Sequence, residues 1–157
     1  MTLPWPLRSV MAGAVGTAAM SLAYNVEHQL RPRVHGPLDY DDSLVPGQIV
    51  KGIMHLSNIT DREEHELGLG LRWSYGSAFG LWHGLLCRRV REPWASLAFG
   101  ATLMTATLMT ATLTLFPLLG RTPPPWRWPP SVIATAFATH AVYVGAVAAV
   151  DDRRIAR

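Results

Sequence analysis

The side chains best suited to chemistry are ionisable groups that interrupt otherwise apolar stretches of the sequence. His140 lies in the middle of the uncharged stretch 128–150, and Tyr143 follows it at one helical turn. His83 lies near the end of another apolar stretch, 68–87. Because an imidazole changes its charge near neutral pH, these three residues form a candidate proton- or ligand-binding site. The alternative for His140 is a neutral, hydrogen-bonded histidine that serves only helix packing.

Histidines and carboxylates could also hold a metal ion or a haem. A bis-histidine haem needs two ligands at equal depth, and His83 and His140 differ in depth by about 7 Å. Haem is therefore disfavoured. Other potential ligands surround the loop between the first two apolar stretches: Glu27, His28, Asp39, Asp41, Asp42, His55, Glu64 and His65. Carboxylates and imidazoles suit zinc, iron or manganese, but no fixed ligand spacing is present. No cofactor is predicted, and a metal ion there stays an open alternative.

Motifs of familiar enzyme and nucleic-acid-binding classes are absent from the sequence. Ser77, in Gly-Ser-Ala-Phe-Gly, stands in the wrong place for a nucleophile elbow. The lone Cys87 excludes an intramolecular disulfide and a CxxC pair. The formal net charge of +3 is small and scattered, so a nucleic-acid partner is not expected.

Charge-free stretches predict the elements that would position these groups. The chain is 49% hydrophobic and only 16% charged, whereas soluble domains are about a quarter charged. A bilayer core about 30 Å thick needs roughly 20 apolar residues in a helix. Stretches of that kind occupy residues 9–26, 94–120 and 128–150, and a further one, 68–87, is interrupted only by Arg72. We expect an all-α, single-domain membrane protein over 1–157, a four-transmembrane-helix bundle with helices at about 9–29, 61–88, 94–119 and 130–150.

The placement of arginine predicts the orientation of this bundle. Basic residues concentrate near helix ends at both termini and in the second loop: Arg8, Arg88, Arg89, Arg91, Arg153, Arg154 and Arg157. The positive-inside rule then places both termini in the cytoplasm and the loop 31–60 outside. An excess of Arg over Lys, with much Ala, Gly and Pro, suggests a bacterial protein. Cleavage of the first apolar run as a signal peptide is the alternative for the N-terminus.

Capping residues predict two helix starts in and after the outer loop. Ser43 can cap a short extramembrane helix over about 44–56, with an apolar face against the membrane or the bundle. The run Thr60-Asp61-Arg62-Glu63 has the pattern of a capping box. The second membrane helix is therefore expected to begin near Asp61.

Small residues recur at every fourth position on three of the predicted helices. The strongest row is Gly76, Gly80 and Gly84, and the other two are Gly13, Thr17 and Ser21, and Ala141, Gly145 and Ala149. A helix face without bulky side chains lets another backbone approach closely. The rows predict a glycine zipper that packs helices within the bundle, in a homo-oligomer or in a larger membrane complex.

The small-residue first helix, at residues 12–20, and the His140-Ala-Val-Tyr143 run resemble YagU-like small bacterial inner-membrane proteins. The resemblance implies an inner-membrane location and transfers no catalytic residue. We expect a non-enzymatic integral membrane protein that acts as an accessory or packing subunit of a membrane assembly. The alternative is a small transporter or membrane enzyme that uses a polar or metal pocket at the outer face, or His140.

Overall fold

The computed structural model describes residues 3–30, 44–56, 58–106, 113–114, 116–119 and 123–151. All regular elements in these residues are helical, which confirms the all-α expectation. They are α1 (Trp5–Leu30), α2 (Leu44–Ile53), α3 (Asp61–Cys87), α4 (Trp94–Met104), α5 (Phe116–Leu119), α6 (Pro130–Asp151) and a 3-10 turn at Pro125–Arg127.

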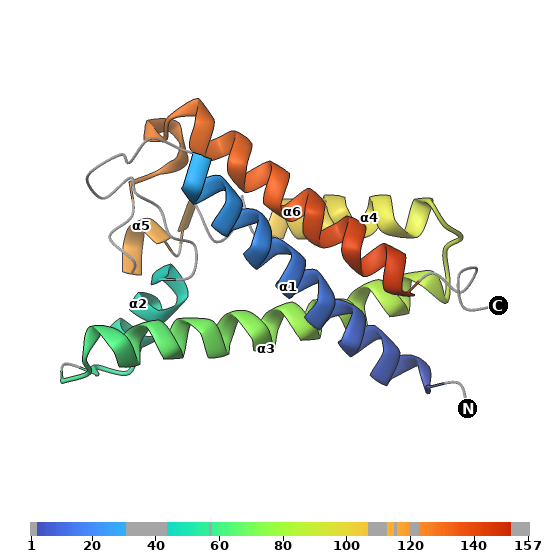
Figure 1. Ribbon diagram of the computed structural model, residues 1–157, viewed down its shortest axis with the longest axis horizontal. Coiled ribbons are helices and arrows are strands. Elements are labelled where there is room, and N and C mark those ends of the chain that lie inside the picture. Colours follow the sequence, from blue (N-terminus) through green and yellow to red (C-terminus); the bar gives the residue numbers. More distant parts are fainter. Residues whose placement is uncertain are drawn as a thin grey trace.

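The three long helices carry the architecture. α1 packs extensively against both α3 and α6, and α4 lies against α3 and α6. α1 begins, α3 ends, α4 begins and α6 ends at the same end of the bundle, on the right in Figure 1. α2 contacts α3 near the opposite end. The buried apolar core is drawn from α1, α4 and α6: Ala12, Met20, Tyr24, Phe99, Leu103, Tyr143 and Val147.

α3 begins where its capping residues predict. The Glu63 N–H donates to Thr60 Oγ1 at 3.3 Å, and the Thr60 N–H donates to Glu63 Oε2 at 2.7 Å. The capping box therefore satisfies backbone donors at the helix start. Lys51 of α2 forms an ion pair with Glu64 (N–O distance 2.5 Å), which ties the short helix to α3.

The predicted helix 94–119 is described only at its two ends. α4 reaches Met104 and a π turn covers residues 105–106, while α5 spans four residues, Phe116–Leu119. Most of the threonine-rich repeat, at 107–112, lies outside the described residues. At its start, the Thr102 hydroxyl donates to the carbonyls of Ala98 and Phe99, both at 2.9 Å. Such back-bonding competes with the helical ladder and bends helices.

Among the described helices, α6 alone is long and apolar enough to cross a membrane by length and composition. α1 and α3 are longer, at 26 and 27 residues, but they do not meet this test. This test of length and composition thus supports one crossing.

Candidate functional site

A buried polar cluster lies where α1 begins and α6 ends. Its centre is the imidazole of His83, whose side chain is fully buried, beside Asp151, which is 1% exposed. The ring nitrogen Nδ1 lies 3.1 Å from Asp151 Oδ2. On the other side of the ring, Nε2 lies 3.1 Å from Ser96 Oγ and 3.3 Å from Glu92 Oε1. The imidazole therefore connects the end of α6 with the start of α4.

Residues of α1 complete the surroundings of the Asp151 carboxylate. Arg8 Nε donates to Asp151 Oδ1 at 3.1 Å, and Ser9 Oγ lies 3.2 Å from Oδ2. Gly84 makes room for this approach, since a Cβ there would lie 2.7 Å from Ser9 Cβ. The buried carboxylate is thus hydrogen-bonded and has a basic partner on each side, as a buried charge requires.

A thiol and a second carboxylate border the other side of His83. Cys87 follows His83 by one turn of α3, and its Sγ lies 3.7 Å from both ring nitrogens. Cys87 Sγ is also 3.3 Å from Glu92 Oε1. Glu92 is held at the start of α4, where it accepts hydrogen bonds from the Ser96 N–H at 3.2 Å and the Ser96 hydroxyl at 2.9 Å. Three different kinds of metal-binding atom therefore face one another here.

His140 and Tyr143 lie farther along α6 in the bundle interior. His140 is 7% exposed, and its Nδ1–H donates to the Ala136 carbonyl at 2.7 Å. The Tyr143 hydroxyl donates to the Gly76 carbonyl on α3 at 2.6 Å. Phe99 lies between Tyr143 and His83, with ring centroids 6.1 and 5.1 Å away respectively. The ring of Phe99 therefore contacts both His83 and Tyr143, two of the three residues expected to share a site.

The predicted outer metal ligands do not converge in the part of the chain that is described. Glu27 accepts a hydrogen bond from Thr135 at 3.0 Å, and Glu64 pairs with Lys51. The histidines of this set are exposed: His28, His55 and His65. Asp39, Asp41 and Asp42 lie outside the described residues. The described residues bring three such ligands together elsewhere, at His83, Cys87 and Glu92.

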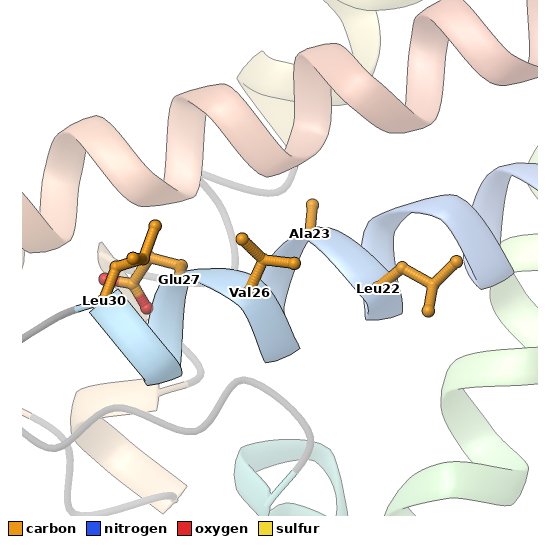
Figure 2. A pocket seen from close by; sticks show the side chains of 5 residues that line it. All are labelled: Leu22, Ala23, Val26, Glu27 and Leu30. Atoms are coloured by element: carbon orange, nitrogen blue, oxygen red, sulfur yellow. The ribbon is translucent and has the colours of Figure 1, made fainter.

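An open apolar pocket of about 550 Å³ lies beside the second half of α1. Figure 2 shows its five lining side chains, all from that helix: Leu22, Ala23, Val26, Glu27 and Leu30. Glu27 is the single ionisable group in this lining. A polar ligand needs several convergent groups to fix its orientation, and the pocket offers one.

The small-residue rows of α1 and α3 face each other. A Cβ on Gly13 would lie 2.6 Å from the Gly76 carbonyl oxygen, and a Cβ on Gly80 would lie 2.7 Å from the Gly13 nitrogen. A Cβ on Gly76 would overlap Thr17 Oγ1. The Ser21 hydroxyl donates to the Thr17 carbonyl of its own helix at 2.8 Å. Close approach of the two backbones therefore depends on the glycines.

The row on α6 has a different environment. Ala141, Gly145 and Ala149 are exposed, and no atom lies within 4 Å of a Cβ built on Gly145. α6 meets α1 through another face, where a Cβ on Gly16 would lie 2.6 Å from Val147 Cγ2. Gly16, which lies outside the predicted rows, is therefore the close-approach residue of this contact.

Most of the buried cluster was not among the predicted site residues: Arg8, Ser9, Cys87, Glu92, Ser96 and Asp151. Two signals in the sequence point toward it. His83 and Cys87 are four residues apart, so a helix places them on one face. Arg8 and Asp151 carry opposite charges at the same end of the first and last apolar stretches.

Comparisons of the chain with protein-family models, with curated proteins and with solved structures find no match. Over the residues that the structure describes, the fold and the cluster define an all-helical protein in which one helix is long and apolar enough to cross a membrane and ends at a buried ionisable cluster.

Proposed function

We propose that the chain is an integral protein of the bacterial cytoplasmic membrane. The distribution of polarity carries this proposal, because many large apolar side chains are exposed while several polar or charged ones are buried. Large apolar residues are exposed on all four main helices, among them Met11, Leu22, Trp73, Leu85, Leu97, Phe137 and Val142. Polar or charged residues are buried: Ser9, Thr17, Arg72, His83, Thr139, His140 and Asp151. Lipid favours this arrangement, in which ionisable groups face the bundle interior.

The proposed topology has four crossings with both termini in the cytoplasm. α1 and α3 are about 39 and 40 Å long and α6 about 33 Å, each more than a bilayer core of about 30 Å. The remaining crossing, the third in chain order, begins at Trp94, after the arginine-rich turn 88–91. Reporter fusions at Arg157 and after Leu56 test the topology. Cytoplasmic activity at Arg157 and periplasmic activity after Leu56 are expected, and a periplasmic signal at Arg157 contradicts the topology.

We further propose a non-enzymatic role as an accessory subunit that docks another transmembrane helix. The observation behind this role is the exposed row Ala141, Gly145 and Ala149, which no other helix of the described chain covers near Gly145. In lipid, small residues let two helices approach and gain van der Waals contact over their length. A second copy of this chain or a larger membrane assembly can supply that helix.

Native mass spectrometry in mild detergent tests the docking role. Wild-type chain is expected above its monomer mass, or bound to a partner chain, and Gly145→Leu should return it to the monomer. Gly70→Leu is the matched control, since no atom lies within 4 Å of a Cβ at Gly70 either and it is outside the row. A monomeric wild type without a partner, or an assembly unaffected by Gly145→Leu, contradicts the role.

A small transporter or membrane enzyme is the second candidate. The buried pair Asp151 and His83, with the partly exposed Glu92 beside it, favours this candidate, since ionisable residues inside a membrane domain mark ion or substrate pathways. This group lies at the proposed cytoplasmic end, opposite the outer loop. Uptake or turnover that depends on His83 in reconstituted vesicles would support this candidate over the accessory role.

A further inference from the structure

Three metal-binding side chains of different kinds converge at the end of α3. His83 and Cys87 lie one turn apart on this helix, and Glu92 returns to them from the turn before α4. Their ligand atoms all lie within 4.8 Å of one another, and no other group of three does so among the described residues. Imidazole, thiolate and carboxylate are each established zinc ligands.

The separations of the three ligand atoms fit one metal ion between them. Around tetrahedral Zn²⁺, with bonds of about 2.0 to 2.3 Å, ligand atoms lie roughly 3.3 to 3.6 Å apart. His83 Nε2 is 3.3 Å from Glu92 Oε1, and Cys87 Sγ is 3.3 Å from the same oxygen and 3.7 Å from Nε2. Cys87 Sγ is also 3.7 Å from Nδ1, so it does not lie closer to the nitrogen that would bind the ion. Rotation about the Cα–Cβ bond of Cys87 would bring the sulfur to an ion held at Nε2.

Asp151 orients the His83 ring in the way that metal sites require. A ligating histidine donates its other ring N–H to a carboxylate, which fixes the tautomer and the ring plane. Asp151 Oδ2 lies 3.1 Å from Nδ1, and the two side chains are 1% and 0% exposed. With the proton on Nδ1, the lone pair of Nε2 faces Glu92 and Ser96. The His83 ring is thus already oriented so that Nε2 can bind a metal ion on the side of Glu92 and Ser96.

Ser96 and the solvent border the remaining coordination position. Ser96 Oγ lies 3.1 Å from His83 Nε2 and 2.9 Å from Glu92 Oε1. The Glu92 side chain is 19% exposed, and Cys87 and Ser96 are partly exposed. An ion can therefore enter from the end of the bundle without unfolding of the helices. Three protein ligands and one open position are typical of zinc sites that also bind water or a substrate.

We propose that His83, Cys87 and Glu92 bind one divalent transition-metal ion, with Zn²⁺ as the expected occupant, through Nε2, Sγ and a carboxylate oxygen. As the hydrated ion sheds waters, the thiol of Cys87 releases its proton to water and a sulfur–metal bond forms. The neutral imidazole contributes the Nε2 lone pair, and no group changes oxidation state. This inference does not rest on the accessory role or on the membrane topology proposed above.

Cobalt titration of the purified full-length chain in mild detergent tests the site. After removal of bound metal with a chelator, Co²⁺ should saturate at one ion per chain and produce a sulfur-to-cobalt charge-transfer band, and Zn²⁺ should displace it. Absence of saturable binding, or saturation without the charge-transfer band, would overturn the proposal.

Substitutions locate the ion. Cys87→Ser should abolish the charge-transfer band, and His83→Gln should weaken Co²⁺ binding by more than about tenfold. Asp151→Asn, which acts through His83, should weaken it by about tenfold. The matched control is His140→Gln, which alters a buried histidine on α6 outside the cluster and should leave the affinity unchanged. If His140→Gln weakens Co²⁺ binding as much as His83→Gln does, the ion lies elsewhere. The same conclusion follows if the charge-transfer band persists in Cys87→Ser.

A measurement on the wild-type chain avoids variants that fail to fold. Cys87 is the single cysteine of the sequence, so alkylation by a maleimide reports on this thiol alone. Bound Zn²⁺ should slow alkylation by about tenfold or more, since the ligated thiolate is occupied, and Mg²⁺ should not. An alkylation rate unchanged by Zn²⁺ would contradict the proposed site.

Discussion

Asp151, the last residue of α6, lies with its Oδ2 atom 3.1 Å from Nδ1 of His83 on α3, although 68 residues separate them in the sequence. The other carboxylate oxygen of Asp151 accepts a hydrogen bond from Arg8 of α1 at 3.1 Å. One buried carboxylate therefore ties three helices together at the same end of the bundle. The stability of this end should depend on its charge.

Asp151→Asn keeps the shape of the side chain and removes its charge. Because Arg8 and His83 then lose their shared anionic partner, we expect the free energy of unfolding to fall by about 3 kcal/mol. Thermal unfolding in mild detergent measures the loss. Glu66→Gln is the control, since it removes an exposed ion pair with Arg62 and should cost less than about 0.5 kcal/mol. Equal losses in the two variants would contradict the prediction.

Gly80→Ala tests the close approach of α1 and α3. The added Cβ would overlap the Ser9 carbonyl oxygen and lie 2.7 Å from the Gly13 nitrogen. These are backbone atoms, which cannot rotate away as a side chain can, so the two helices must separate. We expect the free energy of unfolding, measured by heat or denaturant, to fall by about 2 kcal/mol. Gly70→Ala on the same helix meets no atom within 4 Å and should be neutral or stabilising by up to about 1 kcal/mol. Similar stabilities of the two variants would show that the glycine row does not limit packing.

Tyr143→Phe tests the hydrogen bond between α6 and α3. The Tyr143 hydroxyl donates to the Gly76 carbonyl at 2.6 Å, and both groups are buried. Loss of the hydroxyl leaves the carbonyl with one fewer donor, so we expect the free energy of unfolding to fall by about 1 kcal/mol. Tyr75→Phe, at a residue 39% exposed, is the control and should change stability less. No difference between these variants in thermal unfolding contradicts the prediction.

The capping box predicts a pH dependence at the start of α3. Hydrogen bonds from the Thr60 backbone N–H, and then from its hydroxyl, lower the pKa of Glu63 below its ordinary value. Since the folded pKa is the lower one, this carboxylate stabilises the fold above its unfolded pKa, and the contribution is lost as the pH falls through the folded pKa. The difference in thermal midpoint between wild type and Glu63→Gln should therefore shrink from about pH 6 to about pH 3. A difference that is constant with pH would contradict this role for Glu63.

The helix starts and the all-helical class could be predicted from the sequence because they depend on neighbours within about four residues. The capping box at Thr60 and Glu63 joins residues three apart, and it determines where α3 begins. The short helix α2 begins at Leu44, where the sequence predicts a helix start. The end of α4 at Met104 was harder to predict. Just before this end the Thr102 hydroxyl donates to the Ala98 and Phe99 carbonyls, and an apolar pattern does not encode such competition with the helical backbone.

The partners of the buried groups were decided by the tertiary structure alone. Three small-residue rows look alike in the sequence, yet those on α1 and α3 meet while the row with Gly145 faces outward. Likewise, His83 was expected to share a site with Tyr143, and it pairs instead with Asp151. Each residue turns a helix by about 100°, so the partner of a side chain depends on the rotation and crossing of whole helices. Packing among residues distant in the chain sets that rotation, and no local pattern encodes it.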